Sequence, residues 1–216
     1  MEKPFKIVYE GGSGEIIEKK SRFIATVKPV SSEEEALAFI ESMRKKYWDA
    51  THNCFAYVLG DRNENARCSD DGEPAQTAGR PMLDVLLGEG IHNTAVVVTR
   101  YFGGTLLGTG GLVRAYSKAV QEGLAGSTVV VRENCARIVI YSDYNALGKI
   151  QYIAGTMELN ALDSQYTDIV TTTWLVKEEK KDTFIEKVTQ ATNGQAKIED
   201  QGRCFAAFSG REPILL

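Results

Sequence analysis

This sequence of 216 residues has no long apolar run and no excess of positive charge, and each absence excludes a class of protein. The N-terminal segment MEKPFKIVYE lacks the apolar stretch of a signal peptide, and no segment approaches the ~18 apolar residues of a membrane span. We therefore expect a cytoplasmic protein without a membrane contact. The net charge of −4 excludes a surface that embraces nucleic acid on all sides, because phosphate neutralisation requires a strongly positive face. Any nucleic-acid role must use a local patch.

Cysteine and histidine are also scarce. The cysteines are too scattered for a CxxC zinc knuckle or a dense disulfide framework, so we expect buried, reduced thiols. A histidine metal site would need both His52 and His92 together with carboxylates or Cys54, and we predict neither a metal nor a cofactor. His52 and Cys54 lie two residues apart on an expected strand and so face the same side, but nothing identifies an oxyanion hole for a Cys–His nucleophile pair. The cysteines are Cys54, Cys68, Cys135 and Cys204.

Glycine is concentrated in residues 96–119, VVVTRYFGGTLLGTGGLVRAYSKA. An apolar strand over 96–99 leads into a turn and then into a helix that begins near Leu112, whose basic face carries Arg114 and Lys118. The turn glycines permit positive φ, and the free N–H groups at the helix start favour an anion such as phosphate. The segment is neither a Walker loop nor a GxGxxG fingerprint in a βαβ unit, so the known nucleotide motifs are absent. The turn glycines are Gly103, Gly104, Gly108, Gly110 and Gly111.

Turn residues and hydrophobic periodicity predict an α+β protein of two domains, residues 1–134 and 135–216. The first domain opens with an antiparallel meander, and Ser32 with Glu35 forms a capping box before its first helix. Its expected strands lie at 6–10, 15–20, 21–30, 52–59, 66–68, 91–99 and 128–132. Its expected helices lie at 33–46, from about Met82 to Gly88 or Gly90, and from 112 onward.

The second domain restarts the pattern with the order βαββαβ, which is the ferredoxin-like plan. Asp143 can cap its first helix, and Asn193-Gly194 can stop its second. Its expected strands lie at 137–141, 159–170, 171–176 and 196–208, the last of them bent.

Residues 70–82, DDGEPAQTAGRPM, have no periodicity and predict a shaped loop. Asp70, Asp71 and Glu73 can bind Mg²⁺, or place one carboxylate of raised pKa for acid–base work. The same residues are what a tight turn with Asx-type hydrogen bonds requires, so both interpretations stay open. Gly72 and Thr77 complete the candidate loop.

A basic set from the two segments can converge beside the glycine-rich turn and hold phosphates of RNA. Its members are Arg80, Arg100, Arg114 and Lys118. The structural alternative is that these cations pair with the acidic residues Asp70, Asp71, Glu73 and Asp84 and hold the loop in shape. Tyr101 and Phe102 can stack on bases or pack in the core.

Four segments in this order resemble the IMPACT family in its bacterial YigZ branch: KKSRFIA at 19–25, ATHNCFAY at 50–57, DDGEPAQTAGRPM at 70–82, and residues 96–119. The resemblance implies a first domain folded like the second domain of small-subunit ribosomal protein five and a ferredoxin-like second domain similar to one in elongation factor G. It also implies a link to translation, because the family's eukaryotic members are regulators that compete for a ribosome-associated activator of the general-control kinase. Bacteria lack that kinase pathway, so that particular partner is not carried over.

We therefore expect a translation-associated regulator that binds RNA or a ribosome-associated protein through the glycine-rich turn and the adjacent basic face. The alternative is a nucleotide- or phosphate-binding enzyme of unknown reaction that uses the acidic loop and Mg²⁺. A third interpretation is a protein–protein adaptor that uses Tyr141, Tyr166 and Trp174 on the second domain's sheet. The sequence assigns neither a catalytic residue nor an oligomeric state.

Overall fold

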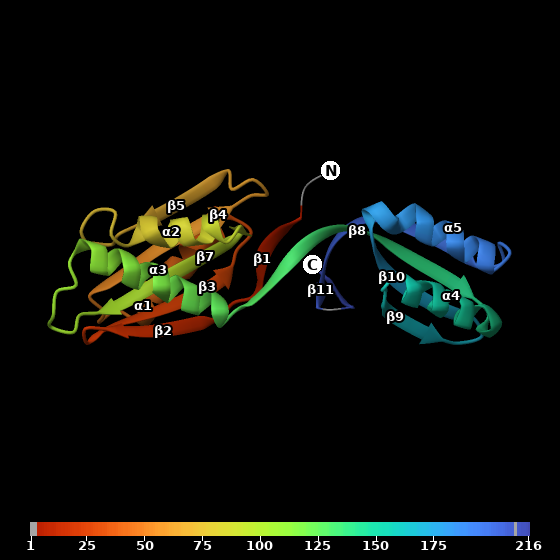
Figure 1. The fold of residues 1–216 in the computed structure, drawn as a ribbon, viewed down its shortest axis with the longest axis horizontal. Coiled ribbons are helices and arrows are strands. Elements are labelled where there is room, and N and C mark those ends of the chain that lie inside the picture. Colours follow the sequence, from red (N-terminus) through yellow and green to blue (C-terminus); the bar gives the residue numbers. More distant parts are fainter. Residues whose placement is uncertain (1–3, 210) are drawn as a thin grey trace. The chain divides into compact units, whose positions relative to one another are not determined.

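The computed structural model describes residues 4–209 and 211–216 and shows an α+β protein with two sheets (Figure 1). The chain divides into two compact units between Val130 and Val131, inside the strand β8, Thr128–Ser142. The sequence predicts two strands here, with a domain boundary after residue 134. A single strand forms instead, because residues 133–136 keep their pairing with β11, Lys197–Ser209.

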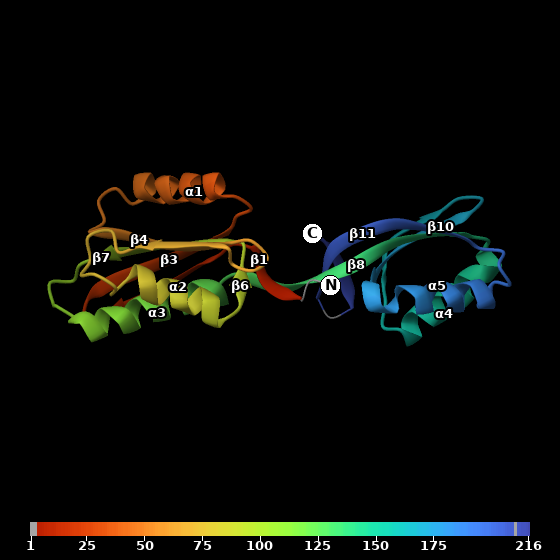
Figure 2. The ribbon, with the colours of Figure 1, turned by 90° about the horizontal axis from the view of Figure 1, so that it is seen from above.

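The first unit, Phe5–Val130, is built on a five-stranded antiparallel sheet. Its strands, in sheet order, are β2 (Ser13–Glu18), β3 (Ser21–Pro29), β7 (Thr94–Tyr101), β4 (His52–Leu59) and β5 (Asn65–Ser69). Figure 2 shows α1 on one face of this sheet and α2 and α3 on the other. These helices span Glu33–Lys46, Gly79–Gly88 and Thr109–Ala125.

Burial on both faces explains the apolar run in β7. Val96 and Val98 pack into the core beneath α2 and α3, whereas Ala95 and Val97 pack into the core beneath α1. Side chains alternate along a strand, so only a strand covered on both sides needs apolar residues at consecutive positions. The helix α3 contributes the face that its spacing predicts, including Tyr116, which is fully buried.

The prediction of an opening antiparallel meander is wrong for its first strand. β1, Phe5–Glu10, pairs in parallel with β6, Ile91–His92, rather than with β2. The glycines that follow β1 serve close packing instead of a tight hairpin, since a Cβ on Gly12 would overlap the backbone of Gly126. The expected strand over 91–99 is likewise divided, because Asn93 adopts a φ of 51° between β6 and β7.

The helices of the first unit differ in how well their starts are predicted from neighbouring residues. α1 begins as predicted, with Ser32 Oγ accepting the Glu35 N–H at 3.3 Å, while the Glu35 carboxylate accepts the Ser31 N–H at 2.7 Å. α2 and α3 each begin three residues before their predicted starts at 82 and 112. A rule that uses only local sequence assigns both first turns to loop, because that of α2 contains glycine and proline and that of α3 contains two glycines. Both turns are helical in the structure.

The second unit follows the predicted order and adds a terminal strand, β12 (Glu212–Leu215). Its sheet order is β9-β10-β8-β11-β12, and Figure 2 shows α4 and α5 together on one face. Trp174 packs against Phe184 in the core under these helices, which removes it as a surface contact, whereas Tyr166 is exposed. The remaining elements are α4 (Tyr144–Thr156), β9 (Ala161–Tyr166), β10 (Val170–Lys177), the 3₁₀ turn Glu178–Lys180 and α5 (Lys181–Ala191).

All four cysteines are free thiols. Cys54 and Cys135 are buried, but Cys68 is exposed and Cys204 half-buried, so the expectation of burial fails for those two. Cys68 lies on β5, the edge strand of the sheet. Within the described part of the chain, no helix combines the length and apolar character needed to cross a bilayer.

Candidate functional site

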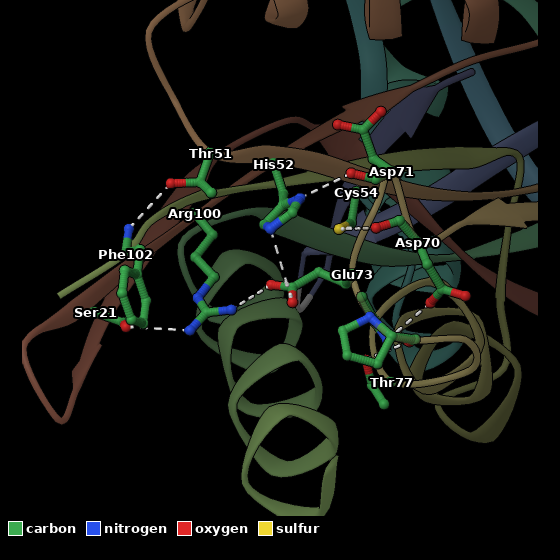
Figure 3. Close-up of polar contacts among 12 residues, drawn as sticks. Ser21, Thr51, His52, Cys54, Asp70, Asp71, Glu73, Thr77, Arg100 and Phe102 are labelled. Carbon is green, nitrogen blue, oxygen red and sulfur yellow. Dashed lines mark hydrogen bonds and ion pairs between the residues drawn. The ribbon is translucent and has the colours of Figure 1, made fainter. Parts of the chain in front are cut away.

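Strand register brings the candidate residues together at one end of the first sheet. His52, at the start of β4, lies directly opposite Arg100, near the end of β7. The loop after β5 delivers Glu73 to the same place, beside the start of α3 (Figure 3). These elements enclose a cavity of about 440 Å³ with mainly apolar walls, which we call the apolar cavity. Its lining includes His52, Glu73, Arg100, Phe102, Leu106 and Leu112.

A buried ion pair forms the floor of the apolar cavity. Arg100 Nη1 lies 2.5 Å from Glu73 Oε1, with the two side chains only 6% and 3% exposed. The Tyr116 hydroxyl donates to the same carboxylate oxygen at 2.8 Å, and Arg100 Nη2 donates to Ser21 Oγ at 3.3 Å. A charge this deep is tolerated only when it is paired, so Arg100 is committed to Glu73. Phe102 lies under the guanidinium at 5.5 Å.

His52 presents one ring nitrogen to the loop and the other to Glu73. Nδ1 lies 2.8 Å from the Asp71 carbonyl oxygen, which can only accept, so Nδ1 carries a proton. In the neutral ring Nε2 is therefore an acceptor, and it faces Glu73 Oε2 at 3.8 Å. Both short hydrogen bonds to Glu73 fall on its other oxygen. This contact between His52 Nε2 and Glu73 Oε2 is an ion pair only when the ring is protonated.

Cys54 is a structural thiol rather than a nucleophile. Its Sγ lies 3.0 Å from the Asp70 carbonyl oxygen and 3.3 Å from the Tyr116 hydroxyl. Burial raises the pKa of Cys54 far above its ordinary value, and burial likewise raises the pKa of Tyr116. Because catalysis requires a thiolate, the sequence hypothesis of a His52–Cys54 pair finds no chemical basis here.

The acidic loop uses one of its three carboxylates, that of Asp70, to hold its own shape. Asp70 accepts the backbone N–H groups of Gln76, Ala78 and Gly79 at 2.8, 2.9 and 2.8 Å. These bonds cap α2, whose N-cap residue Ala78 has no side-chain acceptor. Burial raises the pKa of Asp70, but the three backbone donors outweigh it and the net pKa is lowered.

The remaining loop residues point in different directions. Asp71 accepts the Asn53 N–H at 2.7 Å and pairs with Arg44 at 3.2 Å, while Thr77 Oγ1 donates to the Pro74 carbonyl at 2.6 Å. Gly72, at a φ of 87°, lines the apolar cavity with Glu73. The three acidic side chains therefore do not converge, and no group of three potential metal ligands gathers anywhere in the described residues.

The glycine-rich turn leaves the start of α3 uncapped by any side chain. Gly108, with a φ of 74°, is the N-cap, and its carbonyl accepts the Leu112 N–H at 3.0 Å. Gly104 also has a positive φ, of 80°. Gly103 donates its N–H to Ser21 Oγ at 3.1 Å and packs so closely on Lys20 that a Cβ there would overlap the backbone.

The predicted cations occupy three separate places. Arg114 and Lys118 are exposed and line a second hollow of about 240 Å³, which we call the basic hollow. Arg100 is buried in the apolar cavity, and Arg80 bonds Asp84 on the exposed side of α2 at 2.8 Å. The basic hollow is lined by Ile16, Glu18, Lys19, Leu107, Gly111, Arg114, Ala115 and Lys118.

Sequence reasoning missed Lys19, Leu106 and Leu107. Lys19 sits in the turn between β2 and β3, and the pair of lysines at 19–20 was the available signal. Leu106 and Leu107 lie within the glycine-rich turn, where only the glycines attract notice. Of the two aromatic candidates, Phe102 lines the apolar cavity, whereas the Tyr101 hydroxyl donates to Asp49 at 2.9 Å.

Comparison with known proteins supplies a family context. Residues 19–124 match the Impact N-terminal domain, and residues 142–195 match a domain of unknown function, DUF1949. The IMPACT family member YvyE of Bacillus subtilis is 43% identical over 193 residues, which is 89% of each chain. The IMPACT family member YigZ of Escherichia coli is 37% identical over 182 residues, covering 83% of this chain and 89% of the relative. A crystal structure of a hypothetical protein is 34% identical to this chain and superposes with a TM-score of 0.59. The match covers 94% of this chain and 98% of the chain in that structure.

Proposed function

Because the chain belongs to the IMPACT family, we propose that it is a cytoplasmic, translation-associated regulator that binds RNA through the basic hollow. Family membership supports the link to translation, and the basic hollow supports the chemistry of the contact. Exposed Lys and Arg side chains are the groups with which proteins contact the phosphates of nucleic acid.

The observation that carries the proposal is the set of unpaired cations at the basic hollow. Lys19, Arg114 and Lys118 are all exposed, and among the described residues none of them has an ion-pair partner. Glu18 is the single carboxylate in the lining, so three positive charges face one negative charge. Arg114 can bind a phosphate bidentately, and the start of α3 adds the positive end of its helix dipole.

Arg100 does not belong to this contact. Its charge is neutralised by Glu73 within the protein, and its side chain is 6% exposed. Separating Arg100 from Glu73 to free the guanidinium would leave a buried carboxylate unpaired, which costs more than a phosphate contact returns. The proposal therefore uses the helix face and the lysine turn, and it leaves the buried pair to the fold.

We also propose identities for the two folds. The second unit is ferredoxin-like and similar to a domain of elongation factor G, which is supported by its βαββαβ order and by the sheet order β9-β10-β8-β11. The first unit is folded like the second domain of small-subunit ribosomal protein five, as the family resemblance implies. We also propose that each fold is a separate domain, with the boundary near residue 134.

The test is a salt series of RNA mobility shifts with parallel co-sedimentation on ribosomes. Arg114→Ala and Lys118→Ala are each expected to weaken binding and to reduce the slope of log K against log salt by about 1. Arg80→Ala is the matched control, because Arg80 is also exposed but pairs with Asp84. Absence of RNA binding at low salt would overturn the RNA contact. Co-sedimentation that persists in that case would indicate a ribosomal protein as the partner.

A further inference from the structure

Two large apolar side chains are exposed at the glycine-rich turn. Phe102, just before the first glycine, is 46% exposed, and Leu106, between the glycines, is 82% exposed. Both line the apolar cavity, so they are neighbours in the structure as well as in the sequence. Soluble proteins rarely leave neighbouring apolar groups in water unless that surface meets a partner. Contacts between cations and phosphates do not account for these two side chains.

The Phe102 ring is supported from inside the protein. The Phe102 N–H donates to Thr51 Oγ1 at 3.2 Å, and the Arg100 guanidinium lies over the ring at 5.5 Å from its centroid (Figure 3). Arg100 is itself held by its ion pair with Glu73. Because the guanidinium covers one face of the ring, the exposed part of the ring lies away from it. Phe102 therefore offers a supported aromatic surface to a flat group that approaches from outside.

The basic hollow adjoins this aromatic surface. Leu107 lines both hollows, and Gly103, the residue after Phe102, packs against the backbone of Lys20. Lys20 follows Lys19, which is one of the cations of the basic hollow. The cations and the aromatic ring therefore lie on two sides of the same turn, and a flexible strand that crosses the turn can contact both.

The pairing of cations with an exposed aromatic ring distinguishes between forms of RNA. Proteins bind single strands through cations that contact the phosphates and aromatic side chains on which the bases stack. A duplex offers chiefly its phosphates, since its bases are paired and the major groove of A-form RNA is too narrow for side chains. We infer that the RNA is single-stranded at this contact, with phosphates at the basic hollow and an unpaired base stacked on Phe102. This inference rests on the proposed RNA contact and defines the form of RNA that the contact takes.

The apolar cavity has room for that base. Its volume of about 440 Å³ lies in the range of sites for small molecules, and Leu106 and Leu112 add apolar walls beside Phe102. Every base has an aromatic face, so stacking tolerates any sequence. The site therefore selects unpaired RNA rather than a particular base.

The test compares a single strand of about twelve nucleotides, a length that such sites hold, with the duplex of the same strand. Fluorescence anisotropy at one fixed salt concentration gives both affinities. Phe102→Leu keeps an apolar side chain but removes the aromatic face, and it weakens single-strand binding about tenfold, as expected for one stacked base. Duplex binding changes by less than about twofold, because no cation is removed. Phe102→Trp, which keeps an aromatic face, retains single-strand affinity.

A matched control and an altered RNA separate stacking from other effects. Tyr166→Leu removes an exposed aromatic side chain of the second unit and leaves both affinities unchanged. An abasic strand of equal length keeps the phosphates but has no bases, so it binds the wild type about tenfold more weakly than the intact strand. Phe102→Leu does not weaken the abasic strand further. A strand that carries iodouridine, irradiated in the complex, crosslinks to Phe102.

The outcomes separate this inference from the RNA contact itself. If Arg114→Ala weakens RNA binding but Phe102→Leu weakens strand and duplex equally, or weakens neither, the single-strand inference is overturned and the RNA contact stands. Equal affinity of the wild type for intact and abasic strands, or crosslinks confined to residues other than Phe102, has the same consequence. Absence of RNA binding at low salt overturns both.

Discussion

The two hollows that flank the start of α3 share Leu107 but use their cations in opposite ways. In the apolar cavity Arg100 is buried against Glu73, whereas in the basic hollow Arg114 is exposed and has no partner among the described residues. Both arginines belong to the same glycine-rich segment, and one residue type serves two purposes. The difference lies in position, because Arg100 sits on an interior strand and Arg114 on the outer face of a helix.

The largest expected effect comes from breaking the buried pair. Arg100→Met leaves the Glu73 carboxylate buried without its cation, and we expect a loss of about 3–5 kcal/mol in the free energy of unfolding, measured by urea denaturation. The double variant Arg100→Met, Glu73→Leu should recover most of this loss, since it removes the stranded charge. A single variant that loses less than about 1 kcal/mol would mean that Glu73 is not dependent on Arg100.

A smaller effect is expected from the residue that shapes the acidic loop. Asp70→Ala removes the acceptor for three backbone N–H groups at the start of α2, and we expect a loss of about 2 kcal/mol in the free energy of unfolding. The pKa of Asp70 is lower in the folded protein than its ordinary value of 3.8. Its contribution is therefore fully present above the unfolded pKa and is lost as the pH falls through the folded pKa.

Denaturation of wild type and Asp70→Ala at several pH values checks both the size and the sign of this effect. The difference between the two proteins should be constant above about pH 5 and should shrink below about pH 4. Asp71→Ala is the neighbouring control, since Asp71 accepts one backbone N–H and forms an ion pair with the exposed Arg44. A difference that grows as the pH falls would contradict the role of the Asp70 carboxylate as a cap.

The sequence predicts elements whose signals are local and misses what distant residues decide. The Ser32 cap, strand β4 and the buried face of α3 follow from spacing alone, and the structure confirms them. The early start of α2 depends on Asp70, which lies nine residues before Gly79, outside the range of a local capping rule, and reaches it only in the folded loop. The pairing of β1 with β6 is equally non-local, because no nearby pattern distinguishes it from a hairpin.

For the candidate site, too, the sequence selects residues but does not give the properties that depend on distant contacts. Sequence reasoning selected Arg100, Glu73 and Arg114, but it could not tell a cation that is neutralised in the core from one that is free at the surface. That distinction requires the register that places His52 opposite Arg100 and the loop that carries Glu73 to them. Burial and pairing are properties of the assembled sheet, so composition and motif spacing alone do not contain them.

Arg114→Ala sharpens the comparison from the exposed side. Because Arg114 is exposed and has no partner among the described residues, we expect its removal to change the free energy of unfolding by less than about 0.5 kcal/mol. Urea denaturation beside Arg100→Met provides the measurement, and the same sample shows weaker RNA binding. A large loss of stability in Arg114→Ala would place this arginine with Arg100 as a structural residue.

The smallest effect is expected at Arg80, where two weak terms oppose each other. The exposed pair with Asp84, four residues on, contributes about 0.3–0.5 kcal/mol, but a cation in the first turn of α2 faces the positive end of the helix dipole. Arg80→Ala should therefore change the unfolding free energy by no more than about 0.3 kcal/mol at low salt and by less at 1 M salt. Since Arg80 lines neither hollow, its removal should also leave RNA binding unchanged. Equal losses of RNA affinity in Arg80→Ala and Arg114→Ala would mean that charge spread over the surface, rather than the basic hollow, attracts the nucleic acid.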